Sequence, residues 1–245
     1  MKDIFTNGKT LILACDQGFE HGPIDFNETN IDSEYIFDIA KEGKFNAIAV
    51  QAGLAKHYYS EKYKDIPLIV KLNGKTRFDN EDPLSLQHTS VDYAVKLGAS
   101  AVGYTIYLGS VHEQQMFKEF AKICEEAHKF GIQSVCWMYP RGKYIKDDLD
   151  TDVLAYAARI AHELGADVVK LKFNGDVEAM KWVVKSAGKT KVVFAGGSKI
   201  KEDEFLEVAK QMVESGACGM AVGRNVWQSD KPLKMAAGLR QIFGL

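Results

Sequence analysis

Eight short apolar segments recur along the 245-residue chain, and they constrain its fold more than any other feature. Each is at most six residues long, rich in Val, Ile, Leu and Ala, and continuously apolar, which is the pattern of a parallel strand covered on both faces. The segments are Thr10–Cys15, Ala47–Gln51, Pro67–Leu72, Ala101–Ile106, Gln133–Met138, Asp167–Lys172, Lys191–Ala195 and Cys218–Val222. Parallel strands of this kind require crossover connections, usually helices.

Helical patterns separate these segments. Residues Thr151–Leu164 carry apolar side chains at helical spacing and are followed by Gly165, a typical helix stop. The same pattern predicts helices over Ser90–Leu97, Glu113–Phe130, Glu178–Ser186 and Glu202–Ser215. Eight strands alternating with helices predict an α/β fold, a (β/α)8 TIM barrel that residues 1–245 form as a single domain. A doubly wound open sheet is the alternative, but the GxGxxG turn that it favours is absent after the first strand.

Two lysines at the end of the sixth apolar segment indicate amine chemistry. Lys170 and Lys172 are two residues apart, so on a strand their side chains point to one face. Burying an ammonium is costly, and two crowded amines push each other toward the neutral form. A neutral amine is the nucleophile that a Schiff base with a carbonyl compound requires. The residues alone do not choose between Lys170 and Lys172.

Polar residues follow other predicted strands at the end where a barrel collects its chemistry. The first strand is followed by Asp16 and, in the next loop, His21; we interpret Asp16 as a site carboxylate rather than a turn residue. Trp137 and Tyr139 share one face at the end of the fifth strand, and Arg141 follows them. Two core aromatics would be the simpler interpretation, but this position favours a substrate wall and a proton donor.

The third strand also contributes a basic residue near its end. Lys71 is predicted either to line the cavity or to hold a carboxylate there.

Glycine pairs after the seventh and eighth strands indicate a phosphate site. The chain reads Gly196-Gly197-Ser198 after the seventh strand and Gly223-Arg224 after the eighth. Exposed backbone N–H groups in these two loops commonly bind phosphate in a barrel of this kind, and Arg224 would add a charge-assisted hydrogen bond.

Composition excludes several other classes of protein. The formal charge of −2 and the pI of about 6.3 argue against a nucleic-acid or anionic-membrane partner. Four cysteines without CxxC spacing predict reduced thiols and a cytoplasmic protein, and the histidines form no metal-binding motif. No window approaches 18 apolar residues, so no membrane association is expected.

Taken in order, these motifs resemble the archaeal-type class I fructose-1,6-bisphosphate aldolases, within the DeoC/FbaB-like Schiff-base aldolase superfamily. The resemblance runs from about residue 5 to the C-terminus. It rests on six segments: Asp16–Pro23, Lys71–Thr76, Tyr139–Gly142, Val169–Lys172, Ala195–Lys199 and Val222–Gln228. It implies a metal-independent lyase with no cofactor beyond a covalent Schiff base with its sugar phosphate substrate. It also implies a ring-based homo-oligomer such as a decamer.

The resemblance assigns roles that the residues left open. It places the Schiff base on Lys170, the first lysine of the K-x-K pair, acid–base chemistry on Tyr139, and the strand-one aspartate at Asp16. The predicted reaction, part of glycolysis and gluconeogenesis, reversibly cleaves fructose 1,6-bisphosphate to dihydroxyacetone phosphate and glyceraldehyde 3-phosphate. Trp137 favours this branch of the superfamily.

Three alternatives stay open at this point. Two are relatives with nearly the same motifs, a 2-amino-3,7-dideoxy-D-threo-hept-6-ulosonate synthase of aromatic amino-acid biosynthesis and an autoinducer-2 phosphate thiolase. The third is a phosphosugar-binding barrel without catalysis.

Overall fold

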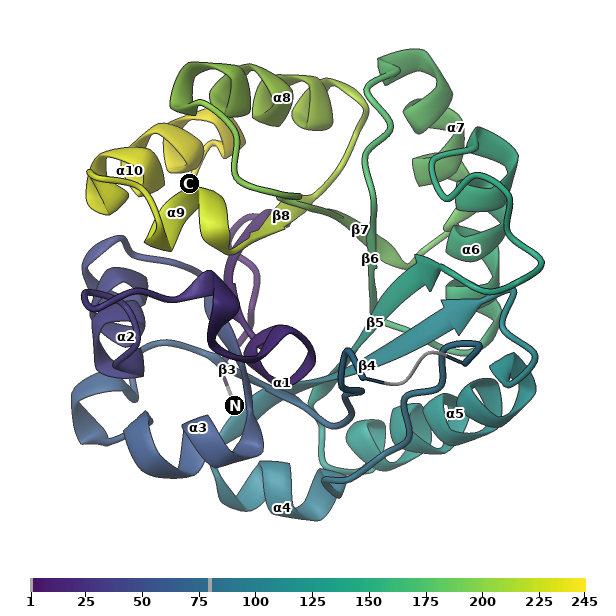
Figure 1. Cartoon of the computed structure of the whole chain (residues 1–245), viewed down its shortest axis with the longest axis horizontal. Coiled ribbons are helices and arrows are strands. Elements are labelled where there is room, and N and C mark those ends of the chain that lie inside the picture. Colours follow the sequence, from purple (N-terminus) through teal and green to yellow (C-terminus); the bar gives the residue numbers. More distant parts are fainter. Residues whose placement is uncertain (1, 79–80) are drawn as a thin grey trace.

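A closed barrel of eight parallel strands, ringed by helices, forms the centre of the computed structural model, which describes residues 2–78 and 81–245 (Figure 1). The strands pair in chain order, and β8 closes the barrel against β1. They are β1 (Thr10–Cys15), β2 (Ala47–Gln51), β3 (Leu68–Lys71), β4 (Ala99–Leu108), β5 (Gln133–Pro140), β6 (Val168–Leu171), β7 (Lys191–Ala195) and β8 (Gly219–Val222). The predicted TIM-barrel fold is confirmed.

Most helices cover the outside of the barrel, whereas α1 (Gly18–His21) and the 3-10 helix η1 (Gly22–Asp25) lie in the loop after β1, at the carboxyl ends of the strands. The others are α2 (Ser33–Glu42), α3 (Ala52–Tyr58), α4 (Val91–Lys96), α5 (Glu113–Lys129), α6 (Thr151–Glu163), α7 (Val177–Ser186), α8 (Glu202–Glu214), α9 (Arg224–Trp227) and α10 (Pro232–Phe243), with the 3-10 helix η2 (Glu61–Tyr63). Side-chain caps fix several starts: Asp150 accepts from the Val153 N–H at α6, and Asp176 accepts from the Ala179 N–H at α7. The five predicted helices lie within a residue of α4 to α8.

Strand lengths differ from the predictions at the end that matters for function. The strands β4 and β5 pair as far as Leu108 and Pro140, so Tyr139 lies within β5, directly beside Tyr107 of β4. In contrast, β6 ends at Leu171, one residue before Lys172. The two lysines therefore do not share one continuous strand.

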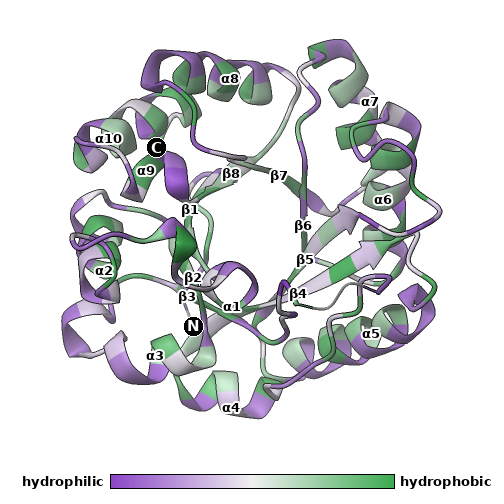
Figure 2. Ribbon diagram, in the orientation of Figure 1, coloured by the Kyte–Doolittle hydropathy of each residue, from purple (hydrophilic) through white to green (hydrophobic). Residues whose placement is uncertain are grey.

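Two apolar cores stabilise the barrel. The larger lies between strands and helices, and Figure 2 shows both hydrophobic and hydrophilic residues on the helices, as expected where one face packs inward. The smaller core fills the barrel interior with Ile4, Ile12, Ala47, Ala49, Ile69, Ala101, Val135, Trp137, Val168, Val193 and Ala221. Ile4 is fully buried in this inner core, and the Thr10 Oγ1 at the start of β1 donates to its carbonyl at 2.7 Å, so Ile4 lies at the amino ends of the strands. No helix among the described residues has the length and apolarity to cross a bilayer.

Candidate active site

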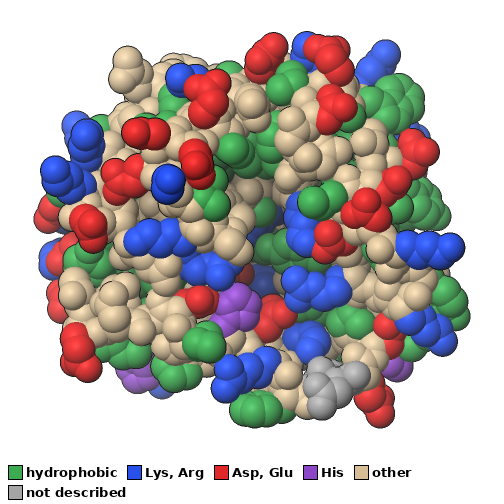
Figure 3. Space-filling model, turned by 45° about the horizontal axis from the view of Figure 1, so that its top comes forward, with side chains coloured by type: hydrophobic (Ala, Val, Ile, Leu, Met, Phe, Trp, Pro, Cys, Tyr) green, Lys and Arg blue, Asp and Glu red, His purple; other side chains and the backbone are tan. Residues whose placement is uncertain are grey.

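A cavity of about 450 Å³ opens at the carboxyl ends of the strands. Figure 3 shows the hollow at the centre of this face, with Lys and Arg side chains around it. Every residue predicted from the sequence to belong to the site lines it: Asp16, His21, Lys71, Trp137, Tyr139, Arg141, Lys170, Lys172, Gly196, Gly197, Ser198, Gly223 and Arg224. The cavity is also lined by residues that the sequence did not single out, including Gln51, Thr105 and Tyr107.

Two buried lysines flank one tryptophan at the floor of the cavity. Lys170 on β6 is 7% exposed, and its Nζ lies 5.4 Å from the Trp137 ring centroid. Lys71 on β3 is 6% exposed, and its Nζ lies 5.3 Å from the same centroid. The Lys71 ammonium also contacts Asp16, with 3.3 Å between Nζ and Oδ2. The cavity floor therefore holds two amines and one carboxylate around an indole ring.

Burial controls the electrostatics of these amines. It lowers the pKa of Lys170, an effect that the Asp16 carboxylate opposes and the Arg224 guanidinium reinforces. Burial likewise lowers the pKa of Lys71, where Asp16 opposes the effect and the positive charge of Lys170 adds to it. Among the described residues, no carboxylate forms an ion pair with the buried Lys170 amine, in contrast to Lys71, and an unpaired amine suits a carbonyl nucleophile.

The prediction that Lys170 and Lys172 crowd each other within a buried strand is wrong. Lys172 follows the end of β6, its side chain is 29% exposed, and it forms an ion pair with Asp148 of the loop after β5. The second amine near Lys170 is Lys71, which comes from a strand on the other side of the barrel interior. Lys172 lies at the rim of the cavity rather than on its floor.

Tyr139 places a half-buried phenol on the wall of the cavity. Burial raises the pKa of Tyr139, as do the carboxylates of Asp16 and Glu20, whereas the positive charges of Arg141 and Arg224 lower it. The Arg141 guanidinium carbon lies 5.8 Å from the Tyr139 ring centroid. The phenol is thus protonated over the ordinary pH range and is suited to donate a proton.

Glu20 of α1 holds the arginine at this wall. Its carboxylate lies 3.0 Å from the Arg141 Nη1, and the Tyr107 hydroxyl donates to it at 3.4 Å. Glu20 lies in the segment Asp16–Pro23 that the sequence analysis named, but no role was predicted for it, and Tyr107 was missed. Tyr107 lies directly beside Tyr139 on the neighbouring strand. This neighbour became visible only because β4 and β5 pair beyond the strand ends that the sequence predicted.

The glycine loops after β7 and β8 lie side by side, but Gly196 does not serve as predicted. Its N–H donates to the Ala221 carbonyl at 3.0 Å, so it continues the sheet instead of facing a phosphate. A Cβ at Gly196 would lie 2.9 Å from a Val222 methyl group, which explains why a glycine suits this position. Among the described residues, the backbone N–H groups of Gly197 and Ser198 have no acceptor and remain available to an anion.

Asn225 holds the phosphate loop in place, a role that the sequence did not reveal. This buried side chain donates to the carbonyls of Gly196 and Ser198 at 2.8 and 2.9 Å, and it accepts from the Ile200 N–H at 3.0 Å. The two hydrogen bonds that the Asn225 amide donates and the one that it accepts all join it to the loop after β7. These bonds fix the conformation of that loop.

Gly103 on β4 makes room for Trp137, and replacing it is expected to destabilise the floor of the cavity. A Cβ at this position would lie 2.2 Å from the Trp137 ring. We expect Gly103→Ala to lower the free energy of unfolding in urea by about 1–3 kcal/mol, since an overpacked core must shift. Gly53→Ala is the control because, apart from its chain neighbours and the backbone of its own helix, no described heavy atom lies within 4 Å of its Cβ position. Equal stability of the two variants would contradict the conclusion that Gly103 makes room for the Trp137 ring.

The described residues contain no group of three or more His, Cys, Asp or Glu side chains arranged as metal ligands.

Comparisons with known proteins place this site in context. The sequence model of the DeoC/LacD family of aldolases matches residues 10–229. A fructose-bisphosphate aldolase class 1 of Thermoproteus tenax is 48% identical over 96% of this chain and 89% of its own length. A fructose-bisphosphate aldolase class 1 of Halobacterium salinarum is 44% identical over 98% of this chain and 92% of its own length.

Solved structures give the same picture. A crystal structure of an archaeal fructose 1,6-bisphosphate aldolase superposes with a TM-score of 0.94 at 47% identity and covers 99% of this chain and 97% of its own. A second archaeal structure has its catalytic lysine covalently bound to the carbinolamine intermediate of the substrate. It matches with a TM-score of 0.94 and 47% identity, over 98% of this chain and 96% of its own.

Proposed function

Because the chain belongs to the DeoC/LacD family of aldolases, we propose that it is a class I, Schiff-base-forming fructose-1,6-bisphosphate aldolase. It cleaves fructose 1,6-bisphosphate reversibly to dihydroxyacetone phosphate and glyceraldehyde 3-phosphate. The observation that carries the proposal is Lys170, a buried amine of lowered pKa on the cavity floor of a chain that resembles these aldolases over nearly its whole length.

The chemistry follows from a neutral Lys170 amine. The amine attacks the C2 ketone of the substrate to give a carbinolamine, which loses water to give an iminium ion. The iminium accepts the electron pair of the C3–C4 bond as the C4 hydroxyl loses its proton, and glyceraldehyde 3-phosphate leaves. The resulting enamine is protonated at C3, and hydrolysis then releases dihydroxyacetone phosphate and free Lys170.

Two groups serve the proton transfers. Tyr139 carries protons to and from the reacting oxygen and carbon atoms, a contribution on the order of 10²–10⁴-fold for a positioned acid or base. Asp16, held by Lys71 at 3.3 Å, orients substrate hydroxyls and assists dehydration of the carbinolamine. The Asp16 carboxylate favours the charged form of Lys71 and so opposes the effect of burial on the Lys71 pKa.

The two phosphates of the substrate bind at opposite sides of the cavity. The ketone-side phosphate accepts from the backbone N–H groups of Gly197 and Ser198 and from the Arg224 guanidinium. The aldehyde-side phosphate lies at the rim near Arg141 and Lys172. The substrate therefore spans the cavity with its C2 ketone over Lys170.

The pH dependence of kcat/KM tests the role assigned to Lys71. The amine of Lys170 attacks only when neutral, so kcat/KM rises with pH through the Lys170 pKa. Lys71→Met removes a positive charge and frees the Asp16 carboxylate, and both changes raise the Lys170 pKa. We expect the acidic limb of the profile to move to higher pH.

Lys172→Met is the matched control, because Lys172 pairs with Asp148 at the rim. Its acidic limb is expected to stay at the wild-type pH. A Lys71→Met limb that is unmoved, or that moves to lower pH, would contradict the assigned role.

A cleavage assay in the presence of a chelator tests the function itself. Fructose 1,6-bisphosphate is supplied with EDTA, and the triose phosphates are measured with an NADH-linked dehydrogenase. Turnover that survives dialysis against EDTA is expected. Loss of turnover that added divalent metal restores would rule out the metal-independent mechanism.

The cytoplasmic location and the ring-based homo-oligomer are also part of this proposal. Exposed aromatic side chains on neighbouring helices, Tyr156 of α6 and Trp182 of α7, support an assembly of several copies. Light scattering after size exclusion is expected to give a multiple of the 27.3 kDa chain mass. A 27.3 kDa species at assay concentration would rule the assembly out.

A further inference from the structure

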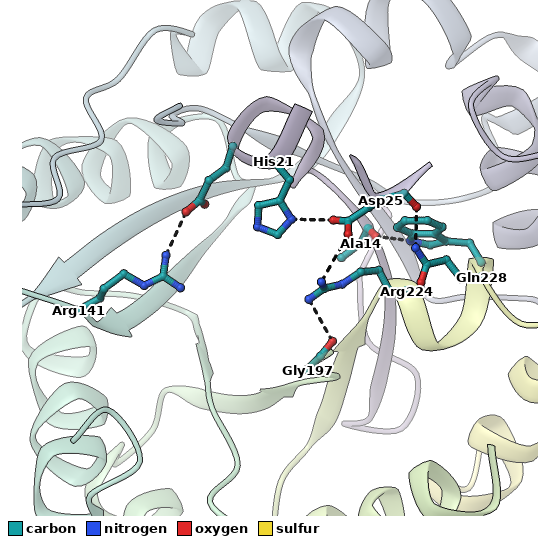
Figure 4. A network of polar contacts seen from close by, with 9 residues as sticks. Ala14, His21, Asp25, Arg141, Gly197, Arg224 and Gln228 are labelled. Carbon is teal, nitrogen blue, oxygen red and sulfur yellow. Dashed lines mark hydrogen bonds and ion pairs between the residues drawn. The ribbon is translucent and has the colours of Figure 1, made fainter. Parts of the chain in front are cut away.

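One carboxylate outside the cavity connects two residues that line it. Asp25 ends η1, and its side chain is only 15% exposed. Its Oδ2 lies 2.6 Å from the His21 Nδ1, and its Oδ1 lies 3.6 Å from the Arg224 Nη1 (Figure 4). His21 and Arg224 line the cavity, whereas Asp25 does not. Asp25 therefore reaches the cavity through its contacts with these two side chains.

The contact with His21 fixes the orientation and tautomer of the imidazole. An ionised carboxylate only accepts hydrogen bonds, so the His21 Nδ1 must carry the proton. The other ring nitrogen, Nε2, then points away from Asp25 and is left for the cavity (Figure 4).

The contact with Arg224 orients a guanidinium beside the phosphate loop. While Nη1 faces Asp25, Nη2 lies 3.5 Å from the Gly197 carbonyl. The guanidinium is planar and presents its N–H groups in a fixed fork, so two such contacts determine where the remaining donors point. They hold the arginine next to the free N–H groups of Gly197 and Ser198.

The segment that carries Asp25 is itself fastened to α9. The Gln228 Nε2 donates to the Asp25 carbonyl at 2.6 Å. The Phe26 ring stacks on the Trp227 ring with 5.3 Å between centroids, and the Trp227 Nε1 donates to the Ala14 carbonyl at 3.1 Å. These contacts tie the β1 loop to the β8 loop, so the Asp25 carboxylate is held in place before a ligand arrives.

We propose that Asp25 is a positioning residue that orders His21 and Arg224 together, so that the ketone-side phosphate site and the His21 imidazole are set by one carboxylate. The proposal rests on the proposed function for the identity of the phosphate ligand. The Asp25–Arg224 arm can be measured by anion binding alone, without turnover.

The first test compares phosphate affinity in Asp25→Asn with the wild-type protein. Asn keeps the size of the side chain and removes its charge. We expect the Kd for inorganic phosphate and for dihydroxyacetone phosphate, measured by calorimetry, to rise by roughly 10–100-fold. In metal sites, removing a carboxylate that orients a histidine ligand weakens binding by this factor, and Asp25 orients a phosphate-binding arginine in a comparable way. Glu28→Gln is the matched control, since Glu28 is an exposed carboxylate on the same connection and is expected to leave both Kd values unchanged.

A double-mutant cycle separates positioning from a general loss of structure. In an Arg224→Met background, Asp25→Asn is expected to change the phosphate Kd by less than about two-fold, because the group that it positions is gone. Asp25→Asn is also expected to lower kcat through His21, and this loss is expected to shrink in a His21→Ala background. Asp25→Ser provides a second replacement that completes the cycle if Asp25→Asn is unstable.

Two results would overturn the proposal. One is a phosphate Kd in Asp25→Asn within about two-fold of wild type. The other is an undiminished effect of Asp25→Asn in the Arg224→Met background. The double-mutant cycle could show the expected coupling for phosphate binding while the wild-type protein fails to cleave fructose 1,6-bisphosphate. In that case the proposed function would fail and the positioning role of Asp25 would stand.

Discussion

Lys170→Ala is expected to lower kcat for cleavage of fructose 1,6-bisphosphate by about 10⁵–10⁶-fold, the scale of losing a covalent nucleophile. In the proposed mechanism the Lys170 amine forms the covalent bond between protein and substrate, and the resulting iminium accepts the C3–C4 electron pair. Lys71 cannot replace it, because its ammonium lies 3.3 Å from the Asp16 carboxylate. Steady-state assays at high enzyme concentration measure the remaining rate.

Lys172→Ala is the matched control for this prediction. Lys172 is paired with Asp148 at the rim, so its loss is expected to raise KM through the aldehyde-side phosphate and to leave most of kcat. If Lys170→Ala kept a substantial part of kcat, or if Lys172→Ala lost as much as Lys170→Ala, the assignment of the nucleophile would be wrong.

Tyr139→Phe is expected to lower kcat by about 10²–10⁴-fold, the usual contribution of a positioned acid–base group. The change removes one hydroxyl from the cavity wall and keeps the ring that packs beside Arg141. The amine remains able to attack, so the variant is expected to accumulate a covalent substrate adduct that turns over slowly. Rapid quench with borohydride and mass spectrometry of the intact protein measures the fraction of adduct.

Tyr104→Phe tests whether any buried phenol near the barrel would give the same result. The Tyr104 hydroxyl donates to Glu119 at 2.7 Å outside the cavity, so its loss is expected to affect stability and to spare kcat. A Tyr139→Phe variant with wild-type kcat would remove Tyr139 from the proton transfers.

The barrel was predictable because its signal is local. Each strand is a short apolar run between helix patterns, and β1, β2 and β7 begin and end at the predicted residues. The helices α2, α3 and α10 were missed, although α2 has an aspartate N-cap and α10 begins at Pro232. Both are recognised signals for a helix start, so α2 and α10 could have been predicted from the sequence.

That the predicted residues gather in one cavity could also be foreseen, because parallel strands bring their carboxyl ends to one face of a barrel. Which side chains contact each other could not. The pairing of Lys71 with Asp16 depends on the barrel interior, and the exposure of Lys172 depends on where β6 stops. Likewise, the N–H of Gly196 is taken by Ala221 through the β7–β8 register. Such contacts join residues far apart in the chain, and no local pattern encodes them.

Borohydride trapping with fructose 1,6-bisphosphate, in the presence of a chelator, tests the central claim most directly. Reduction converts the iminium to a stable secondary amine, and peptide mass spectrometry locates it. We expect the adduct on the peptide that contains Lys170, and no adduct in Lys170→Ala. A folded sample that forms no adduct with this substrate, or that forms it on Lys71 or Lys172, would contradict the mechanism.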